Sequence, residues 1–82
     1  MKLYVGNLPW SVGDTELTAL FAEFGTVESA SVVTDRESGR SRGFGFVEMA
    51  SSEAQQAMAK LNGHSLESRE LRVNEAQSKS RR

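Results

Sequence analysis

The 82-residue chain has no cysteine, one proline and one histidine. Without cysteine, the sequence excludes a disulfide framework, a thiolate metal site and a Cys/His nucleophile pair, and the single His64 excludes a two-histidine metal site. No apolar run approaches the roughly 18 residues that a membrane span needs. The start of the chain, Met1–Val5, runs into Gly6 without the apolar stretch of a signal peptide. We therefore expect a cytoplasmic protein that is not an enzyme and holds no metal or cofactor.

The net charge is small, and the charges are unevenly placed. The net charge is −1, and the last six residues carry three cations and no acid, which leaves −4 over residues 1–76. This balance argues mildly against a nucleic-acid partner, but the location of charges matters more than their sum. The composition, 38% hydrophobic and 26% charged, is typical of one soluble globular domain. We expect a domain over residues 1–76 and a short, basic, disordered tail over residues 77–82.

Hydrophobic periodicity predicts the order strand, helix, strand, strand, helix, strand. Strands are expected over residues 2–6, 27–34, 42–49 and 69–75, with a short edge piece near Leu66. The first helix should begin at Asp14 as its N-cap, carry the apolar stripe Leu17, Leu20, Phe21 and Phe24, and end by Gly25. The second should open on a capping box at Ser52–Gln55 and end at Asn62–Gly63. Two helices cover only one face of a four-stranded sheet, so the other face must meet water or a partner.

The segment from residue 42 to 49, RGFGFVEM, carries the strongest functional signal. Side chains alternate along a strand, so Arg42, Phe44, Phe46 and Glu48 share one face, while small and aliphatic residues share the other. In the first strand, Tyr4 shares a face with Lys2 and Gly6. If these strands pair, Tyr4 and Phe46 lie side by side, since neighbouring strands are about 4.8 Å apart. Aromatic rings beside positive charge form a platform on which bases of a single strand stack.

The octapeptide resembles the signature of the RNA-recognition motif family at every specified position except the last. Residues 3–8, LYVGNL, resemble the family's companion hexapeptide. The resemblance covers residues 1–76 and implies an α/β (α+β) sandwich of the βαββαβ, ferredoxin-like kind. In that fold two helices cover one face of a four-stranded antiparallel sheet, and the two motif strands are central. Residues 35–47 and 73–78 are similar to the glycine-rich, cold-inducible type of RNA-binding protein, without its glycine-rich tail.

The resemblance implies roles for individual residues. Tyr4 would stack on one base and Phe46 on the next, Phe44 would lie against the sugars between them, and Arg42 would pair with a phosphate. Met49 replaces the usual terminal aromatic on the core face, which we interpret as a packing substitution. The complete set of expected RNA-binding residues is Lys2, Tyr4, Asn7, Arg36, Arg40, Arg42, Phe44, Phe46, Arg72 and Asn74.

The charged and polar members of this set have alternative interpretations. Arg42 can instead pair with Glu48 on the same strand face. Arg36 and Arg40 can be ordinary solubilising residues of a loop. Arg72 and Asn74 stand where contacts to base edges would form, but they can also serve only to solvate the outer face.

Trp10 and His64 are the remaining residues to which the sequence assigns a place. Trp10, in the loop after the first strand, is expected to pack partly on the domain rather than act as a third stacking ring. His64 is expected to be a turn residue. The predicted function is binding of single-stranded RNA by a monomer, with single-stranded DNA as a variant. The rival is a protein-interaction module, against which the intact Tyr4, Phe44 and Phe46 argue.

Overall fold

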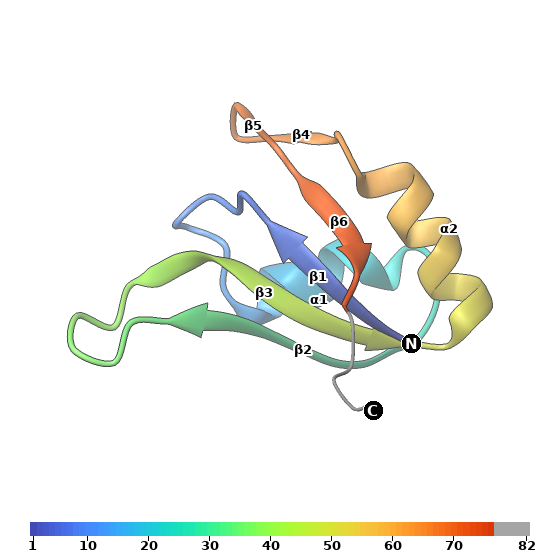
Figure 1. Cartoon of the computed structure of the whole chain (residues 1–82), viewed down its shortest axis with the longest axis horizontal. Coiled ribbons are helices and arrows are strands. Elements are labelled where there is room, and N and C mark those ends of the chain that lie inside the picture. Colours follow the sequence, from blue (N-terminus) through green and yellow to red (C-terminus); the bar gives the residue numbers. More distant parts are fainter. Residues whose placement is uncertain (77–82) are drawn as a thin grey trace.

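The computed structural model of the protein describes residues 1–76, and the predicted basic tail at 77–82 lies outside the described residues. Its elements are β1 (Lys2–Gly6), α1 (Asp14–Ala22), β2 (Val27–Thr34), β3 (Ser41–Met49), α2 (Ser51–Leu61), β4 (Ser65–Leu66), β5 (Arg69–Glu70) and β6 (Arg72–Glu75). The predicted order is confirmed, with the small β4–β5 hairpin inserted between α2 and the last strand of the main sheet (Figure 1).

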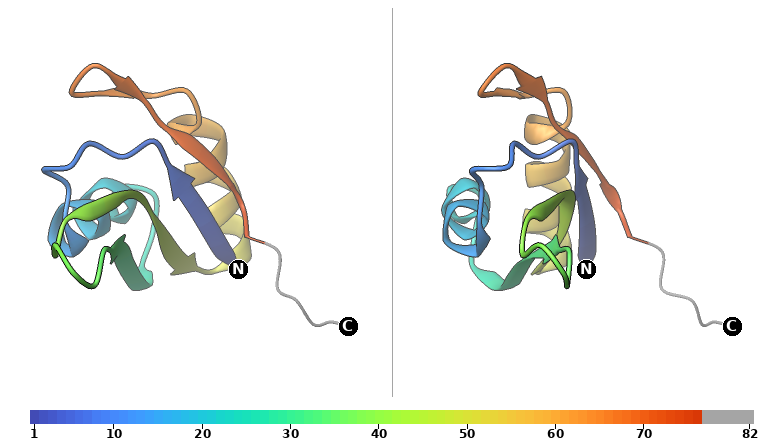
Figure 2. Two further views of the ribbon diagram at one scale, coloured as in Figure 1. Left: turned by 60° about the vertical axis from the view of Figure 1, so that its left-hand side comes forward. Right: turned by 90° about the vertical axis from the view of Figure 1, so that its left-hand side faces the viewer.

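The main sheet is antiparallel and has the strand order β2-β3-β1-β6. The two motif strands, β1 and β3, are therefore central, as the resemblance implied. Both helices lie on the same side of this sheet (Figure 2). No element within residues 1–76 covers the opposite side, which confirms the predicted sandwich with two helices on one face.

Alternation along the strands builds the hydrophobic core under the helices. Leu3 and Val5 of β1 are buried, and so are Gly45, Val47 and Met49 of β3, with Met49 fully buried as predicted. Burial of a side chain of this size contributes roughly 1.5–3 kcal/mol. The fully buried residues are Leu3, Val5, Leu8, Leu17, Phe21, Val47, Met49, Ala54, Ala57, Leu71 and Val73.

Gly45 occupies a core-facing position where the layers approach closely. A Cβ atom there would lie 2.5 Å from the carbonyl oxygen of Ser31 and 3.2 Å from Cδ2 of Leu17. A larger residue would push β2 and α1 away from β3. The glycine of the octapeptide is thus required by the packing of the fold.

Both predicted helix caps are wrong. The N-cap of α1 is Gly13, and Asp14, inside the helix, accepts a hydrogen bond from the Val32 amide at 2.7 Å. The N-cap of α2 is Ala50, without a side-chain cap, and Glu53 accepts from the Thr26 amide at 3.0 Å. Acidic side chains near the helix starts therefore bind backbone of the β2 region, a tertiary contact that local capping rules do not contain.

The last predicted strand, 69–75, is divided in two. β5 pairs with β4, whereas β6 pairs with β1. Between them, the Leu71 amide donates to the His64 carbonyl at 2.9 Å, and the Leu71 carbonyl accepts from Gly63 at 2.8 Å. These bonds turn the chain from the hairpin into the main sheet and place His64 in a turn, as predicted. Neither helix within residues 1–76 is long and apolar enough to cross a membrane.

Candidate nucleic-acid interface

Three aromatic rings gather on the open face of the sheet. Tyr4 and Phe46 are directly opposite in the β1–β3 register, and Phe44 is opposite Gly6. The ring centroids are 5.8 Å apart for Tyr4–Phe44, 5.9 Å for Tyr4–Phe46 and 6.1 Å for Phe44–Phe46. All three side chains are half-buried. The predicted pairing of Tyr4 with Phe46 is confirmed, and we call the three residues the ring cluster.

Gly6 allows the ring cluster to form. A Cβ atom at Gly6 would lie 2.8 Å from both Cε2 and Oη of Tyr4. The Tyr4 ring therefore leans over Gly6, which brings it towards Phe44, the residue paired with Gly6 on β3. Sequence reasoning placed Gly6 on the correct face but missed that its lack of a side chain positions Tyr4.

The strand register places two more predicted residues at the edge of the cluster. Asn74 is paired with Tyr4, and Arg72 is paired with Gly6. Both are exposed, whereas their neighbours Leu71 and Val73 are fully buried. The structure thus brings an amide and a guanidinium from β6 to the same face as the ring cluster.

Lys2 lies on the other side of Phe46. Its Nζ atom is 4.9 Å from the centroid of the Phe46 ring, within reach of a cation–π interaction. Glu48, paired with Lys2 in the register, accepts a hydrogen bond from Oγ of Ser29 at 2.9 Å. Ser29 thus binds the carboxylate that was the alternative partner of Arg42.

Arg42 belongs to an irregular part of β3. The pairing with β2 shifts register between Val32 and Thr34, and Gly43 has a φ of +87°. The alternation predicted from Arg42 onwards is interrupted at Gly43 and is regular from Phe44. Arg42 is exposed at the entrance to the β2–β3 loop.

The loop that follows β2 is closed by Asp35. Its carboxylate accepts hydrogen bonds from the Ser38 amide at 3.2 Å and the Glu37 amide at 2.8 Å. These bonds are the main reason that the pKa of Asp35 lies below its usual value, and the positive charge of Arg42 lowers the pKa further.

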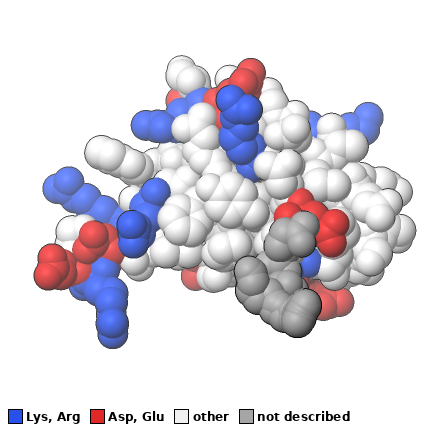
Figure 3. Space-filling view, in the orientation of Figure 1, with Lys and Arg blue, Asp and Glu red and all other residues white. Residues whose placement is uncertain are grey.

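Arg36 and Arg40 are exposed on this loop. The space-filling view shows blue and red side chains interleaved at this end of the molecule, whereas the middle of the face is mostly uncharged (Figure 3). The positive charge of the loop arginines is therefore partly balanced by neighbouring acidic residues. Lys2 and Arg72 are the cations beside the ring cluster.

Asn7 differs from the other predicted site residues, because its side chain is engaged within the protein. Its Nδ2 donates to the Glu70 carbonyl at 2.8 Å, and its Oδ1 accepts from Nη1 of Arg69 at 3.1 Å. Asn7 also has a φ of +59°, in the left-handed region. In the structure it joins the end of β1 to the β4–β5 hairpin.

Trp10 corrects another prediction. It is 69% exposed, the one large hydrophobic side chain within residues 1–76 that is open to solvent to this degree. The expected packing of Trp10 on the domain is therefore wrong. Leu8, two residues earlier, fills the core and its amide donates to the Gly43 carbonyl at 2.8 Å.

Comparison with known proteins connects this geometry to a family. The family model of the RNA recognition motif matches residues 3–72. The 31 kDa chloroplastic ribonucleoprotein of Nicotiana sylvestris is 57% identical over 82 residues, which cover 99% of this chain and 26% of that protein. The glycine-rich RNA-binding protein blt801 of Hordeum vulgare is 48% identical over 79 residues, covering 95% and 49%. The chain thus spans from about a quarter to half the length of these relatives, and the resemblance to the glycine-rich type is confirmed.

Solved structures agree with the fold. The crystal structure of RNA-binding protein PG1 superposes with a TM-score of 0.91 at 46% identity and covers 99% of both chains. The recognition motif of Rna15, determined with bound RNA (GU), superposes with a TM-score of 0.85 at 27% identity, covering 94% of this chain and 83% of that one.

The relatives overturn the predicted location. We expected a cytoplasmic protein because the start of the chain lacks an apolar leader. Relatives from Nicotiana sylvestris, Spinacia oleracea and Arabidopsis thaliana are named chloroplastic, so the cytoplasmic prediction is wrong. An absent apolar stretch carries no information on location when the matched relatives are much longer. What the comparisons share is the domain itself: this chain belongs to the RNA recognition motif family of RNA-binding domains.

Proposed function

We propose that this protein binds a short stretch of single-stranded RNA on the open face of its sheet. The observation that carries the proposal is the ring cluster, three aromatic side chains within about 6 Å of one another on a face that no described element covers. Three half-exposed rings on a solvent face have no role in the core. Stacking with unpaired bases is the interaction that such rings provide, worth roughly 1–3 kcal/mol per base.

Each ring has a separate role in the proposal. Tyr4 and Phe46 stack with successive bases, and Phe44 contacts the sugars between them. Lys2 lies over the Phe46 ring in the free protein. A base that stacks on Phe46 displaces this ammonium group, which then becomes available to a phosphate of the same strand.

The remaining contacts with RNA come from polar residues around the ring cluster. Arg42 and Arg72 are exposed guanidinium groups that bind phosphates, with Arg36 and Arg40 assisting from the loop. Asn74, beside Tyr4, offers both a donor and an acceptor to the edge of the stacked base. Asn7 acts indirectly, by holding the end of β1 against the hairpin.

The proposal covers a monomer that binds without catalysis. The relatives are named as RNA-binding proteins and ribonucleoproteins, and the sole histidine, His64, forms backbone hydrogen bonds of a turn. Single-stranded DNA is the variant ligand, because stacking does not require the 2′-hydroxyl. Matched RNA and DNA oligonucleotides distinguish the two in one assay.

The test is the substitution Phe46→Ala, with Phe46→Tyr as the control that keeps a ring. Fluorescence anisotropy with short RNAs of randomised sequence should show that Phe46→Ala raises Kd by about 5- to 150-fold, the equivalent of one stacked base, whereas Phe46→Tyr stays within about threefold of the parent. Binding by the folded double variant Tyr4→Ala/Phe46→Ala at the parental affinity would contradict the proposal.

A further inference from the structure

The β4–β5 hairpin carries an arginine to which sequence reasoning assigned no role. Arg69 is exposed on β5, and its Nη1 donates to Oδ1 of Asn7 at 3.1 Å. Asn7 directly follows Gly6, the residue over which the Tyr4 ring leans, and Gly6 is paired with Phe44 on β3. The guanidinium of Arg69 is therefore held at the end of β1 that adjoins the ring cluster.

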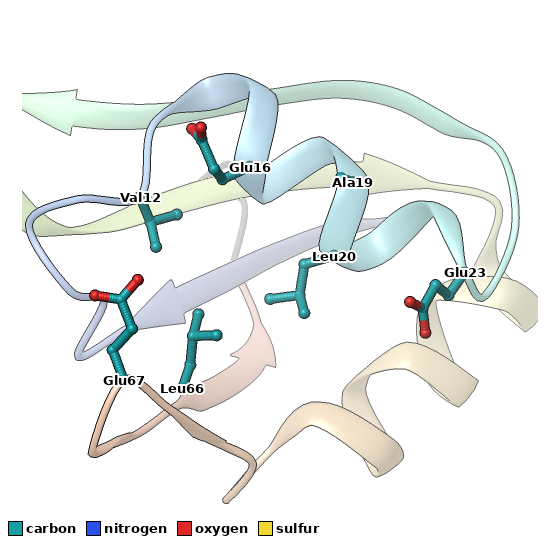
Figure 4. A pocket seen from close by; sticks show the side chains of 7 residues that line it. All are labelled: Val12, Glu16, Ala19, Leu20, Glu23, Leu66 and Glu67. Atoms are coloured by element: carbon teal, nitrogen blue, oxygen red, sulfur yellow. The ribbon is translucent and has the colours of Figure 1, made fainter.

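Two further contacts hold the hairpin against the rest of the domain. The hydroxyl of Ser11 lies 2.8 and 2.9 Å from the two carboxylate oxygens of Glu67 and donates to them. On the side towards α1, the side chain of Leu66 faces Leu20 (Figure 4). These contacts fix the backbone that carries Arg69. A side chain that is already held in place loses less conformational freedom when it binds a ligand.

The group that holds Arg69 is a neutral amide. Nδ2 of Asn7 donates to the Glu70 carbonyl at 2.8 Å, and this bond orients the amide so that its Oδ1 faces Arg69. A carboxylate in this place would neutralise the guanidinium, whereas an amide oxygen positions it and leaves its charge intact. Among residues 1–76, Asn7 is the one hydrogen-bond partner of the Arg69 side chain. The pair Nε and Nη2 thus remains for an anion.

We propose that Arg69, positioned by Asn7, binds a phosphate of RNA that continues past Gly6. The proposal rests on the proposed function, because it extends a strand whose bases stack on Tyr4 and Phe46. The RNA then leads from the sheet towards the β4–β5 hairpin. The planar fork of an arginine suits this contact, since it binds phosphate through two parallel hydrogen bonds. Asn7 is a positioning residue and does not itself contact the RNA.

The first test removes the charge of Arg69. In fluorescence anisotropy with six-nucleotide RNAs of randomised sequence, Arg69→Gln should raise Kd about three- to tenfold. It should also flatten the plot of log K against log salt by about 0.7, the share of one phosphate contact. Arg69→Lys keeps the charge without the fork, so its loss should be smaller and its slope parental. Lys60→Gln removes the same charge from an exposed position on α2 and should leave affinity and slope unchanged.

Uncharged linkages locate the contact on the RNA. The tightest-binding sequence of the pool is made as a series in which one phosphate at a time is replaced by a methylphosphonate. At one linkage, the replacement should weaken binding of the parent by about threefold or more but alter binding of Arg69→Gln by less than about twofold, because that phosphate has already lost its partner. An RNA shortened from that end to remove the linkage should bind the parent and Arg69→Gln equally.

Two substitutions of Asn7 separate positioning from folding. Asn7→Gly adopts the φ of +59° without strain and leaves the charge of Arg69 in place, so it should raise Kd about two- to fivefold at a parental salt slope. Asn7→Asp pairs with Arg69 and neutralises it, so it should flatten the slope by about 0.7, and adding Arg69→Gln should have little further effect. A purely structural role of Asn7 would not make the two slopes differ. Urea unfolding checks that each variant is folded.

Three results would overturn the proposal. The first is parental affinity and slope in folded Arg69→Gln. The second is a methylphosphonate series in which no linkage distinguishes Arg69→Gln from the parent. The third is a linkage whose contribution disappears in Trp10→Ala and persists in Arg69→Gln, which would assign the additional nucleotide to the exposed tryptophan. If Phe46→Ala still weakens binding, these results reject the Arg69 contact alone. If Phe46→Ala also binds as the parent does, the proposed function fails with it.

Discussion

Replacing Gly6 with alanine should weaken RNA binding while leaving the domain folded. Gly6 is the last residue of β1 and is not among the glycines with positive φ, so alanine does not strain the backbone. Its methyl group would lie 2.8 Å from Cε2 and Oη of Tyr4. Carbon atoms in contact are normally about 3.5–4.0 Å apart, so the Tyr4 ring must swing away from its position over Gly6. That movement separates Tyr4 from Phe44, now 5.8 Å away.

The size of the effect follows from the loss of one stacking position. Tyr4 supplies one base-stacking ring, so Gly6→Ala should raise Kd for short RNAs by up to about 5- to 150-fold, equivalent to roughly 1–3 kcal/mol. The assay is a double-mutant cycle measured by isothermal titration calorimetry, with folding checked by urea unfolding. In the Tyr4→Ala background, Gly6→Ala should have almost no further effect, because the ring that it displaces is absent. Parental affinity in folded Gly6→Ala, or full additivity with Tyr4→Ala, would refute the reasoning.

Three other predictions concern packing, pH and salt. Gly45→Ala should lower the free energy of unfolding, measured in urea, by about 1–3 kcal/mol, because the new Cβ atom would lie 2.5 Å from the Ser31 carbonyl oxygen. An unchanged midpoint of urea unfolding would contradict the close approach of β2 to Gly45. The pKa of Asp35 is lowered in the folded protein, so its carboxylate stabilises the β2–β3 loop at pH values above the ordinary pKa of 3.8, and this stabilisation is lost as pH falls through the folded pKa. The amide shifts of Glu37 and Ser38 should therefore titrate together with a midpoint below pH 3.8. A midpoint above pH 3.8 would mean that the fold raises this pKa and would contradict the prediction. A plot of log K against log salt should have a slope of about −1.5 to −3, from two to four phosphate contacts at about −0.7 each, whereas a slope steeper than about −5 would show that more cations take part.

The sheet and its ring cluster could be predicted because they follow from local alternation. Tyr4, Phe44 and Phe46 alternate with apolar residues, and that pattern alone assigns them to the face opposite Val5 and Val47. The same periodicity placed Met49 in the core.

The features that sequence reasoning missed depend on contacts between distant segments. Asp14 was expected as a cap, but β2 brings the Val32 amide to its carboxylate. The β4–β5 hairpin has Glu67 and Ser68 in its turn instead of a recognisable turn pair, so its signal in the sequence is weak.

The β1–α1 loop anchors the β4–β5 hairpin. Asn7, at the end of β1, holds β5, and Ser11, four residues later, holds the turn of the same hairpin. Trp10 stands exposed between them. These two contacts fix the hairpin against the segment that follows β1.

The central claim is that single-stranded RNA lies on the ring cluster. It is tested most directly by NMR titration of the labelled 82-residue chain with short RNAs of randomised sequence, observing backbone amides and aromatic ring carbons together. The account predicts that the largest changes occur at the rings of Tyr4, Phe44 and Phe46 and at amides of β1, β3 and β6. Saturable RNA binding that shifts amides of α1 and α2 and leaves the three ring signals unchanged would contradict it.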